Sequence, residues 1–157
     1  MVGKLSRRAH NVILLAQEEA RFFGHTHLGT AHLLLGLSGE DASVAADVLR
    51  RLGVEADEAR GQVESVEGWG LGDAAARVPF TPRMKRVLEG ASQESLRQGH
   101  RYVGTDHLLL GLLGEREGIS ARVLLNLGVD PDEALQDAVE ILRARGDDED
   151  DPLERVP

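Results

Sequence analysis

Residues 24–37, GHTHLGTAHLLLGL, decide the fold of this chain because a second copy, GHRYVGTDHLLLGL, follows at residues 99–112. The two copies are identical at 10 of 14 positions and align without a gap at an offset of 75 residues. A period of this kind indicates that one structural unit has been duplicated.

The repeat extends well beyond this stretch. The tripeptide LGV at residues 52–54 returns at 127–129, and DEA at 57–59 returns at 132–134, again at an offset of 75. We therefore predict one repeat over residues 5–65 and a second over residues 81–145. Residues 66–80 form the predicted linker, and residues 146–157 form a like-charge acidic tail that we expect to be disordered.

Composition limits the kinds of protein that this chain can be. With 157 residues, two fused repeats that share one core are more plausible than two independent domains of that small size. The net charge of −9 argues against non-specific binding to nucleic acid or to an anionic membrane surface. The chain has no cysteine and no apolar run of membrane-spanning length. We expect a soluble cytoplasmic protein.

Apolar residues recur at helical spacing throughout both repeats. Ser6 is the predicted N-cap of a helix over residues 6–23, and Thr81 followed by Pro82 predicts the equivalent helix start in the second repeat. Nearly all-leucine helices follow at 31–37 and 106–113, then a third and a fourth helix in each repeat. No segment alternates with a period of two. The prediction is an all-α fold of eight helices with pseudo-two-fold symmetry and no sheet.

Gly36 and Gly111 lie inside the two leucine-rich helices. Glycine within a helix costs about 1 kcal/mol relative to alanine. A helix that is apolar on all sides is usually buried. A close contact with another helix would explain glycine at these two positions.

The histidines permit two interpretations. His25, His27 and His32 are close in sequence, so a metal site can be imagined, but the second repeat keeps only His100 and His107 and has Tyr102 in place of His27. Structural histidines at a turn and at the start of a buried helix are the favoured interpretation. We predict neither a metal site nor any other cofactor.

The residues before each leucine-rich helix suggest a binding role. Thr30 and Thr105 are the predicted N-caps, and Asp106 follows just inside the helix. Asp106 complements the helix dipole, or it meets a cation such as a guanidinium beside a helix start that is able to hold an anion. No phosphate-binding loop for ATP and no nucleophile–base–acid set is present in the sequence, so we do not expect an enzyme.

The doubled pattern resembles the N-terminal domain of ClpC-type Clp unfoldases. The pattern is GH, two variable residues, a hydrophobic residue, GT, an acidic residue, H and a leucine run, with LGV further on. AQEEA at residues 16–20 and FTPR at 80–83 are also similar to that family. The resemblance implies a domain of two tandem Clp repeats. It also implies recognition of substrates, adaptor proteins and, in some members, phosphorylated arginine.

The resemblance also implies particular site residues. The family's phosphoarginine pockets use the acid that follows Gly-Thr and the threonine near the first helix start of each repeat. By this resemblance the second repeat keeps its pocket, with Thr81 and Asp106. The first repeat departs from the pattern, because Ser6 replaces the threonine and Ala31 replaces the acid. A guanidinium in the first pocket would lack a charge-assisted hydrogen bond, which typically contributes about 1.5–3 kcal/mol. Phe80 would flank a groove between the repeats.

The function expected from these observations is a non-catalytic recognition module of a Clp protease system, which acts as an adaptor or as a decoy. Its partners would be peptides or proteins, arginine-phosphorylated ones among them, a Clp ATPase or its adaptors, and cyclic-peptide antibiotics, but neither nucleic acid nor membrane. The acidic tail favours a stand-alone protein over an excised domain. The alternative is a structural or oligomerising partner domain without a peptide ligand.

Overall fold

The first helix of each repeat begins at a side-chain cap. The computed structural model describes residues 4–73 and 77–145. In it, α1 (Arg7–Phe22) and α5 (Pro82–Arg97) follow the N-caps Ser6 and Thr81, whose hydroxyls accept hydrogen bonds from the backbone N–H of Ala9 and Met84. These caps confirm the predicted helix starts.

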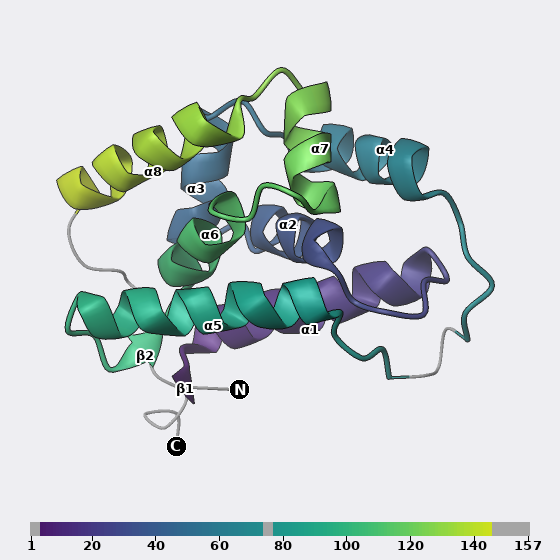
Figure 1. Cartoon of the computed structure of the whole chain (residues 1–157), viewed down its shortest axis with the longest axis horizontal. Helices are drawn as coiled ribbons and strands as arrows, with labels where there is room; N and C mark the ends of the chain where they lie inside the picture. Colours follow the sequence, from purple (N-terminus) through teal and green to yellow (C-terminus); the bar gives the residue numbers. More distant parts are fainter. Residues whose placement is uncertain (1–3, 74–76, 146–157) are drawn as a thin grey trace.

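The eight predicted helices are all present in the described part of the chain, which confirms the all-α class (Figure 1). After α1, the first repeat contains α2 (Thr30–Gly39), α3 (Val44–Arg51) and α4 (Ala56–Glu67). After α5, the second contains α6 (Thr105–Leu113), α7 (Ile119–Asn126) and α8 (Pro131–Arg145). The last turn of α4 extends to Glu67, two residues into the predicted linker.

The two leucine-rich helices, α2 and α6, lie at the centre of the molecule (Figure 1). They contact each other, and α2 also packs against α1, α3, α4 and α7, while α6 also packs against α3, α5 and α8. Residues from both repeats form one hydrophobic core cluster. The two repeats therefore stabilise each other as one unit.

At Gly36 and Gly111 the central helices closely approach the backbone of α1 and α5. A Cβ atom on Gly36 would lie 2.5 Å from the carbonyl oxygen of Val12, and one on Gly111 would lie 2.8 Å from that of Val87. Real Cβ atoms essentially never approach so closely. The predicted close helix–helix contact is confirmed in both repeats.

A short parallel pairing crosses between the repeats, so the prediction of no sheet is wrong. β1 (Lys4–Leu5) pairs with β2 (Tyr102–Val103), and an isolated bridge joins Leu28 to Phe80 at the pseudo-symmetric position. The residues that precede the first helix of each repeat thus pair with the loop before the central helix of the other repeat. Strands of two residues are too short to show a period of two in the sequence.

Among the described helices, none is both long and apolar enough to span a bilayer. The predicted acidic tail, 146–157, lies outside the described residues.

Candidate functional site

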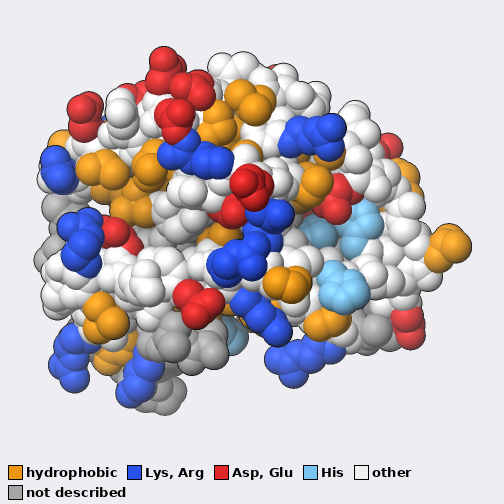
Figure 2. Space-filling view, viewed as in Figure 1, with side chains coloured by type: hydrophobic (Ala, Val, Ile, Leu, Met, Phe, Trp, Pro, Cys, Tyr) orange, Lys and Arg blue, Asp and Glu red, His pale blue; other side chains and the backbone are white. Residues whose placement is uncertain are grey.

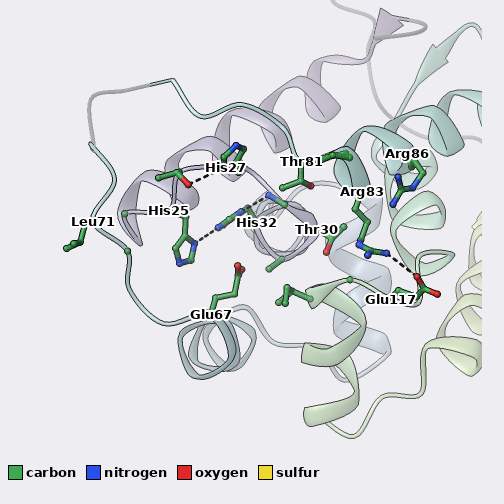
Figure 3. Close-up of a pocket in the computed structure, with 18 residues that line it drawn as sticks. His25, His27, Thr30, His32, Glu67, Leu71, Thr81, Arg83, Arg86 and Glu117 are labelled. Atoms are coloured by element: carbon green, nitrogen blue, oxygen red, sulfur yellow. Dashed lines mark hydrogen bonds and ion pairs between the residues drawn. The ribbon is translucent and has the colours of Figure 1, made fainter.

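The starts of three helices surround a cleft at the interface of the repeats, which we name the Thr81 pocket (Figure 3). The cavity measures about 660 Å³. The helix starts are those of α2, α5 and α7, and the loop at 24–27 and the end of α4 complete the wall. Their backbone N–H groups give this end of the cavity a positive potential.

Two arginines from α5 line the same pocket. Arg83 forms an ion pair with Glu115 at 3.1 Å and a second with Glu117 at 3.6 Å. Burial acts to raise the pKa of Glu115, but hydrogen bonds from two backbone N–H groups and from Arg83 outweigh it and leave the pKa below its usual range. Arg86 is exposed and has no ion pair among the described residues. Figure 2 shows basic side chains and histidines on the same face of the molecule.

The opposite wall of the Thr81 pocket contains a relay of two histidines. The backbone N–H of Gly29 donates to His32 Nδ1 at 2.9 Å, so this nitrogen carries no proton and His32 Nε2 carries it. His32 Nε2–H therefore donates to His25 Nδ1 at 2.8 Å, and His25 Nε2–H donates to the carbonyl of Gly68 at 2.8 Å. Every ring nitrogen of this pair therefore has one defined hydrogen-bond role.

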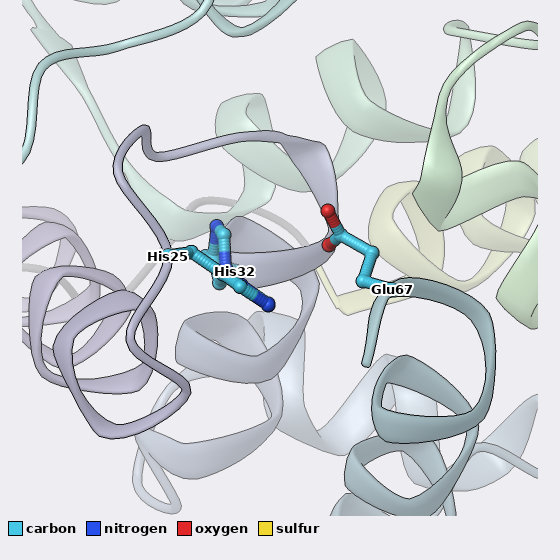
Figure 4. A group of neighbouring side chains, drawn as sticks. All are labelled: His25, His32 and Glu67. Atoms are coloured by element: carbon cyan, nitrogen blue, oxygen red, sulfur yellow. The ribbon is translucent and has the colours of Figure 1, made fainter. Parts of the chain in front are cut away.

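Burial is the main cause that lowers the pKa of His32 to about 4, and the nearby charge of His25 acts in the same direction. The same relay weakens the case for a metal. One nitrogen of each histidine and a carboxylate oxygen of Glu67 lie within 4.8 Å of one another (Figure 4). A metal would need the lone pair of His32 Nε2, and that nitrogen is protonated as long as Nδ1 accepts the cap from Gly29.

The second repeat builds the same relay. The backbone N–H of Gly104 donates to His107 Nδ1 at 2.9 Å, and His107 Nε2 lies 2.9 Å from His100 Nδ1. Both histidine pairs therefore cap the central helices, as the structural interpretation predicted. A third ionisable group, Asp106, lies beside this second relay.

Asp106 is a buried carboxylate with an unsatisfied oxygen. Only 7% of its surface is exposed, and its Oδ1 has no hydrogen-bond partner among the described residues. The nearest histidine nitrogen, His107 Nδ1 at 3.4 Å, already accepts a hydrogen bond and cannot donate one. Asp106 lines a cavity of about 360 Å³, the Asp106 pocket, together with Glu94, Arg97, Gln98, His100, Leu110, Val139, Leu142 and Arg143.

A third cavity lies beside Phe80. Phe80 lines a cavity of about 790 Å³ with Leu14 and Ile13 of α1. The Gln17 side chain donates to the carbonyl of Val78 at 3.0 Å and accepts from its N–H at 3.3 Å, which holds the segment before α5 against α1. The groove thus lies between an element of the first repeat and the start of the second.

The geometry separates two residues that the sequence placed together. Thr81 lines the Thr81 pocket beside Gly29, and Asp106 lines a different cavity, so the prediction that they share one pocket is wrong. The cross-repeat pairing is the reason. It places Thr81 next to the start of α2, and the N–H of Ser6 donates to Val103, which places Ser6 beside the loop that leads into α6.

Thr30 and Thr105 are not the N-caps of their own helices, which is a second correction. Gly29 and Gly104 occupy those positions. The Thr30 hydroxyl instead accepts from the N–H of Ser120 at 3.2 Å, in the first turn of α7. The Thr105 hydroxyl accepts from the N–H of Ala45 at 3.4 Å, in the first turn of α3. Each threonine therefore caps a helix of the other repeat.

Sequence reasoning missed two residues of the Thr81 pocket, Arg86 and Glu67. Neither belongs to a recognisable motif. The signal that could have identified Glu67 is the repeat itself, because the equivalent residue 75 positions later is Leu142.

The comparisons with known proteins agree with this architecture. The family model described as the Clp repeat N-terminal domain matches residues 4–95 and 79–156. The chloroplast chaperone protein ClpC of Pisum sativum is 52% identical over 131 residues, which cover 83% of this chain and 14% of that protein. The chain therefore belongs to the Clp repeat N-terminal domain family.

Solved structures agree with the fold. The N-terminal domain of the chaperone ClpD from Arabidopsis thaliana has a TM-score of 0.75 and 30% identity, with 93% of this chain and 98% of that chain covered. A ClpV N-domain in complex with a VipB peptide has a TM-score of 0.65 at 18% identity, with 85% and 88% covered. The match to ClpV concerns the fold alone.

Proposed function

We propose that this chain is a non-catalytic recognition module of a Clp unfoldase–protease system, which binds peptide or protein ligands as an adaptor or a decoy. The observation that carries the proposal is the buried carboxylate of Asp106, with one oxygen unsatisfied at the wall of a cavity. A buried carboxylate oxygen without a hydrogen-bond donor costs free energy, and a donor on a ligand would recover it. Arg143, which lines the same cavity, is available for an anionic group.

The ligand that fits these charges carries a cation and an anion close together. A guanidinium would meet Asp106, and a phosphoryl group would meet an arginine or a helix start. A phosphoarginine side chain has both. Thr81, Thr105, Ser6 and Thr30 lie around the four helix starts and are proposed to position the ligand, Thr30 and Thr105 through the helices that they cap.

The Phe80 groove supports a second class of ligand for the same module. Its walls combine Phe80, Pro79 and Leu14 with His10 and Arg21, so an apolar ligand with a few polar groups would fit. Cyclic-peptide antibiotics have this character. We propose the groove as their binding surface, and a Clp ATPase or its adaptors as the macromolecular partners.

The first experiment is a calorimetric titration of the chain with a peptide that carries one phosphoarginine. We expect saturable binding, and Asp106→Asn should remove the binding event that shifts the amide resonances of Thr105 and Asp106. Asp137→Asn, an exposed carboxylate on α8, is the matched control and should bind like the parent. No heat with the parent at high micromolar concentration would contradict phosphoarginine recognition.

A pull-down assay tests the adaptor role separately. A Clp ATPase should be retained by the immobilised chain at micromolar concentration. No association under these conditions would argue against an adaptor. The cytoplasm is the proposed compartment, although several plant relatives are named as chloroplast proteins.

A structural or oligomerising role is the alternative. Phe22 and Trp69 are each more than half exposed and contact each other, with ring centroids 5.3 Å apart. An apolar surface of this kind could join two copies. Sedimentation velocity distinguishes the two roles, because a dimer would support the oligomerising role and a monomer would support the recognition module.

A further inference from the structure

The two repeats differ in where they place an acid beside the histidine relay. At the second residue of the central helix, the first repeat has Ala31 and the second has Asp106. Near the end of the fourth helix the order is reversed, with Glu67 in the first repeat and Leu142 in the second. Both pairs are related by the offset of 75. Each relay therefore has one carboxylate beside it, supplied from a different element.

Glu67 extends from the end of α4 into the Thr81 pocket. Figure 3 shows its carboxylate directed at the same wall as Thr30 and His32. Burial raises the pKa of Glu67, and the charge of His25 acts against that shift. A carboxylate at this position is not explained by helix stability, because Glu67 is the last residue of α4 and faces the negative end of the helix dipole.

The relay leaves Glu67 without a donor. His32 uses its only N–H for His25, and His25 uses its only N–H for Gly68, so neither ring donates to the carboxylate. No hydrogen bond or ion pair joins Glu67 to another side chain within the described residues. Glu67, like Asp106, is therefore an acid beside a histidine pair at the wall of a cavity, but Glu67 is exposed whereas Asp106 is buried.

We propose that Glu67 binds the cationic group of a ligand in the Thr81 pocket and takes the place of the acid that Ala31 lacks. The ligand class is a peptide with a guanidinium-bearing side chain. The guanidinium would lie between Glu67 and the space left by Ala31. An anionic group on the same ligand would lie toward Arg86 and the start of α5. This inference rests on the proposed function, and it predicts two ligand sites in each chain rather than one.

Titration of the parent, three site variants and one control variant tests the inference. The peptide carries a single phosphoarginine, and the same peptide with unmodified arginine shows whether the phosphoryl group is needed. We expect two equivalents for the parent, one each for Glu67→Gln and Asp106→Asn, and none for the double variant. The affinity at the altered site should fall by at least about ten-fold. Glu58→Gln, an exposed acid at the start of α4, is the matched control.

Amide resonances assign each binding event to a pocket. Binding in the Thr81 pocket should shift Gly29 and Thr30, and Glu67→Gln should remove these shifts while those of Thr105 and Asp106 remain. Shifts at Gly29 that persist in Glu67→Gln at parent affinity would overturn the inference. Circular dichroism and the thermal midpoint verify that each variant is folded.

An exchange of residues between the repeats gives an independent test. Ala31→Asp combined with Glu67→Leu gives the first repeat the arrangement of the second. This variant should again bind two equivalents, whereas Glu67→Leu alone should bind one. If the parent binds no peptide at all, the proposed function fails. If the parent binds one equivalent that only Asp106→Asn removes, the function stands and the role of Glu67 is refuted.

Discussion

The first and second repeats share their helices, their glycine contacts and their histidine relays, yet they differ at the wall of each cavity. The first repeat has the acid on α4, where Glu67 is more accessible, and covers the end of α1 with Trp69. The second repeat has the acid on α6, where Asp106 is buried, and residue 144 is alanine at the position equivalent to Trp69. The glycine contacts and the histidine pairs are thus the same in both repeats, whereas the acids that line the two cavities differ.

The largest expected effect concerns the glycines that the repeats share. Gly36→Ala should destabilise the chain by about 3 kcal/mol or more, at the upper end of overpacking, because the new Cβ meets the backbone of α1. Gly111→Ala should cost less, since its contact distance is longer. Urea denaturation measures both.

Gly90→Ala is the control for these two variants. Gly90 lies in α5, and a Cβ atom added there would have no neighbour within 4 Å, so alanine should stabilise the chain by about 0.5–1 kcal/mol. Equal stability of all three variants would contradict the close contact.

The relay of the first repeat predicts a loss of stability in acid. The pKa of His32 is about 4 in the folded chain, against an ordinary value of 6.5, so the unfolded chain binds more protons between these values. The contribution of His32 to the free energy of unfolding is complete above pH 6.5 and decreases as the pH falls. It is lost near pH 4, which is a change of about 3 kcal/mol. Unfolding measured from pH 7 to 4 should show this slope.

His32→Gln tests that assignment. Glutamine is the usual side chain at this position of a capping box, so it keeps an acceptor for Gly29 without titrating. The variant should show a flatter pH dependence, whereas His10→Gln on the exposed face of α1 should not. A resonance of His32 that titrates near pH 6.5 would contradict the lowered pKa.

The two cross-repeat caps should differ in strength. Thr30→Val removes the acceptor for Ser120 N–H at the start of α7, whose N-cap residue, Gly118, has no side chain. We expect a loss of about 1–2 kcal/mol in thermal or urea unfolding. Thr105→Val should cost less, because α3 also has the Ser43 hydroxyl as a cap. The reverse order would mean that Thr30 is not the principal cap of α7.

The smallest expected effect concerns Trp69, whose ring packs on the end of α1 in the first repeat. Trp69 contacts both Phe22 and Phe23, and its indole N–H donates to Glu64 at 3.1 Å. Because the ring is more than half exposed, Trp69→Ala should cost less than about 1 kcal/mol in thermal unfolding. A larger loss would show that Trp69 stabilises α1 itself.

The sequence alone determined the helices and the internal symmetry. Helical periodicity, N-caps at Ser6 and Thr81 and glycines at fixed spacing depend on interactions within a few residues, so they can be read along the chain. The same local reasoning identified the structural role of the histidines and the close contacts of Gly36 and Gly111. The constant repeat period then implied that both halves share one fold.

Only the tertiary structure decided which residues face one another. The pairing of β1 with β2, and of Leu28 with Phe80, joins residues far apart in sequence through a few backbone hydrogen bonds. That crossing places Thr81 beside Gly29 and away from Asp106. The packing of α4 on α2 and α7 brings Glu67 to the same pocket. Such neighbours depend on how whole helices pack, and no short-range pattern records that packing.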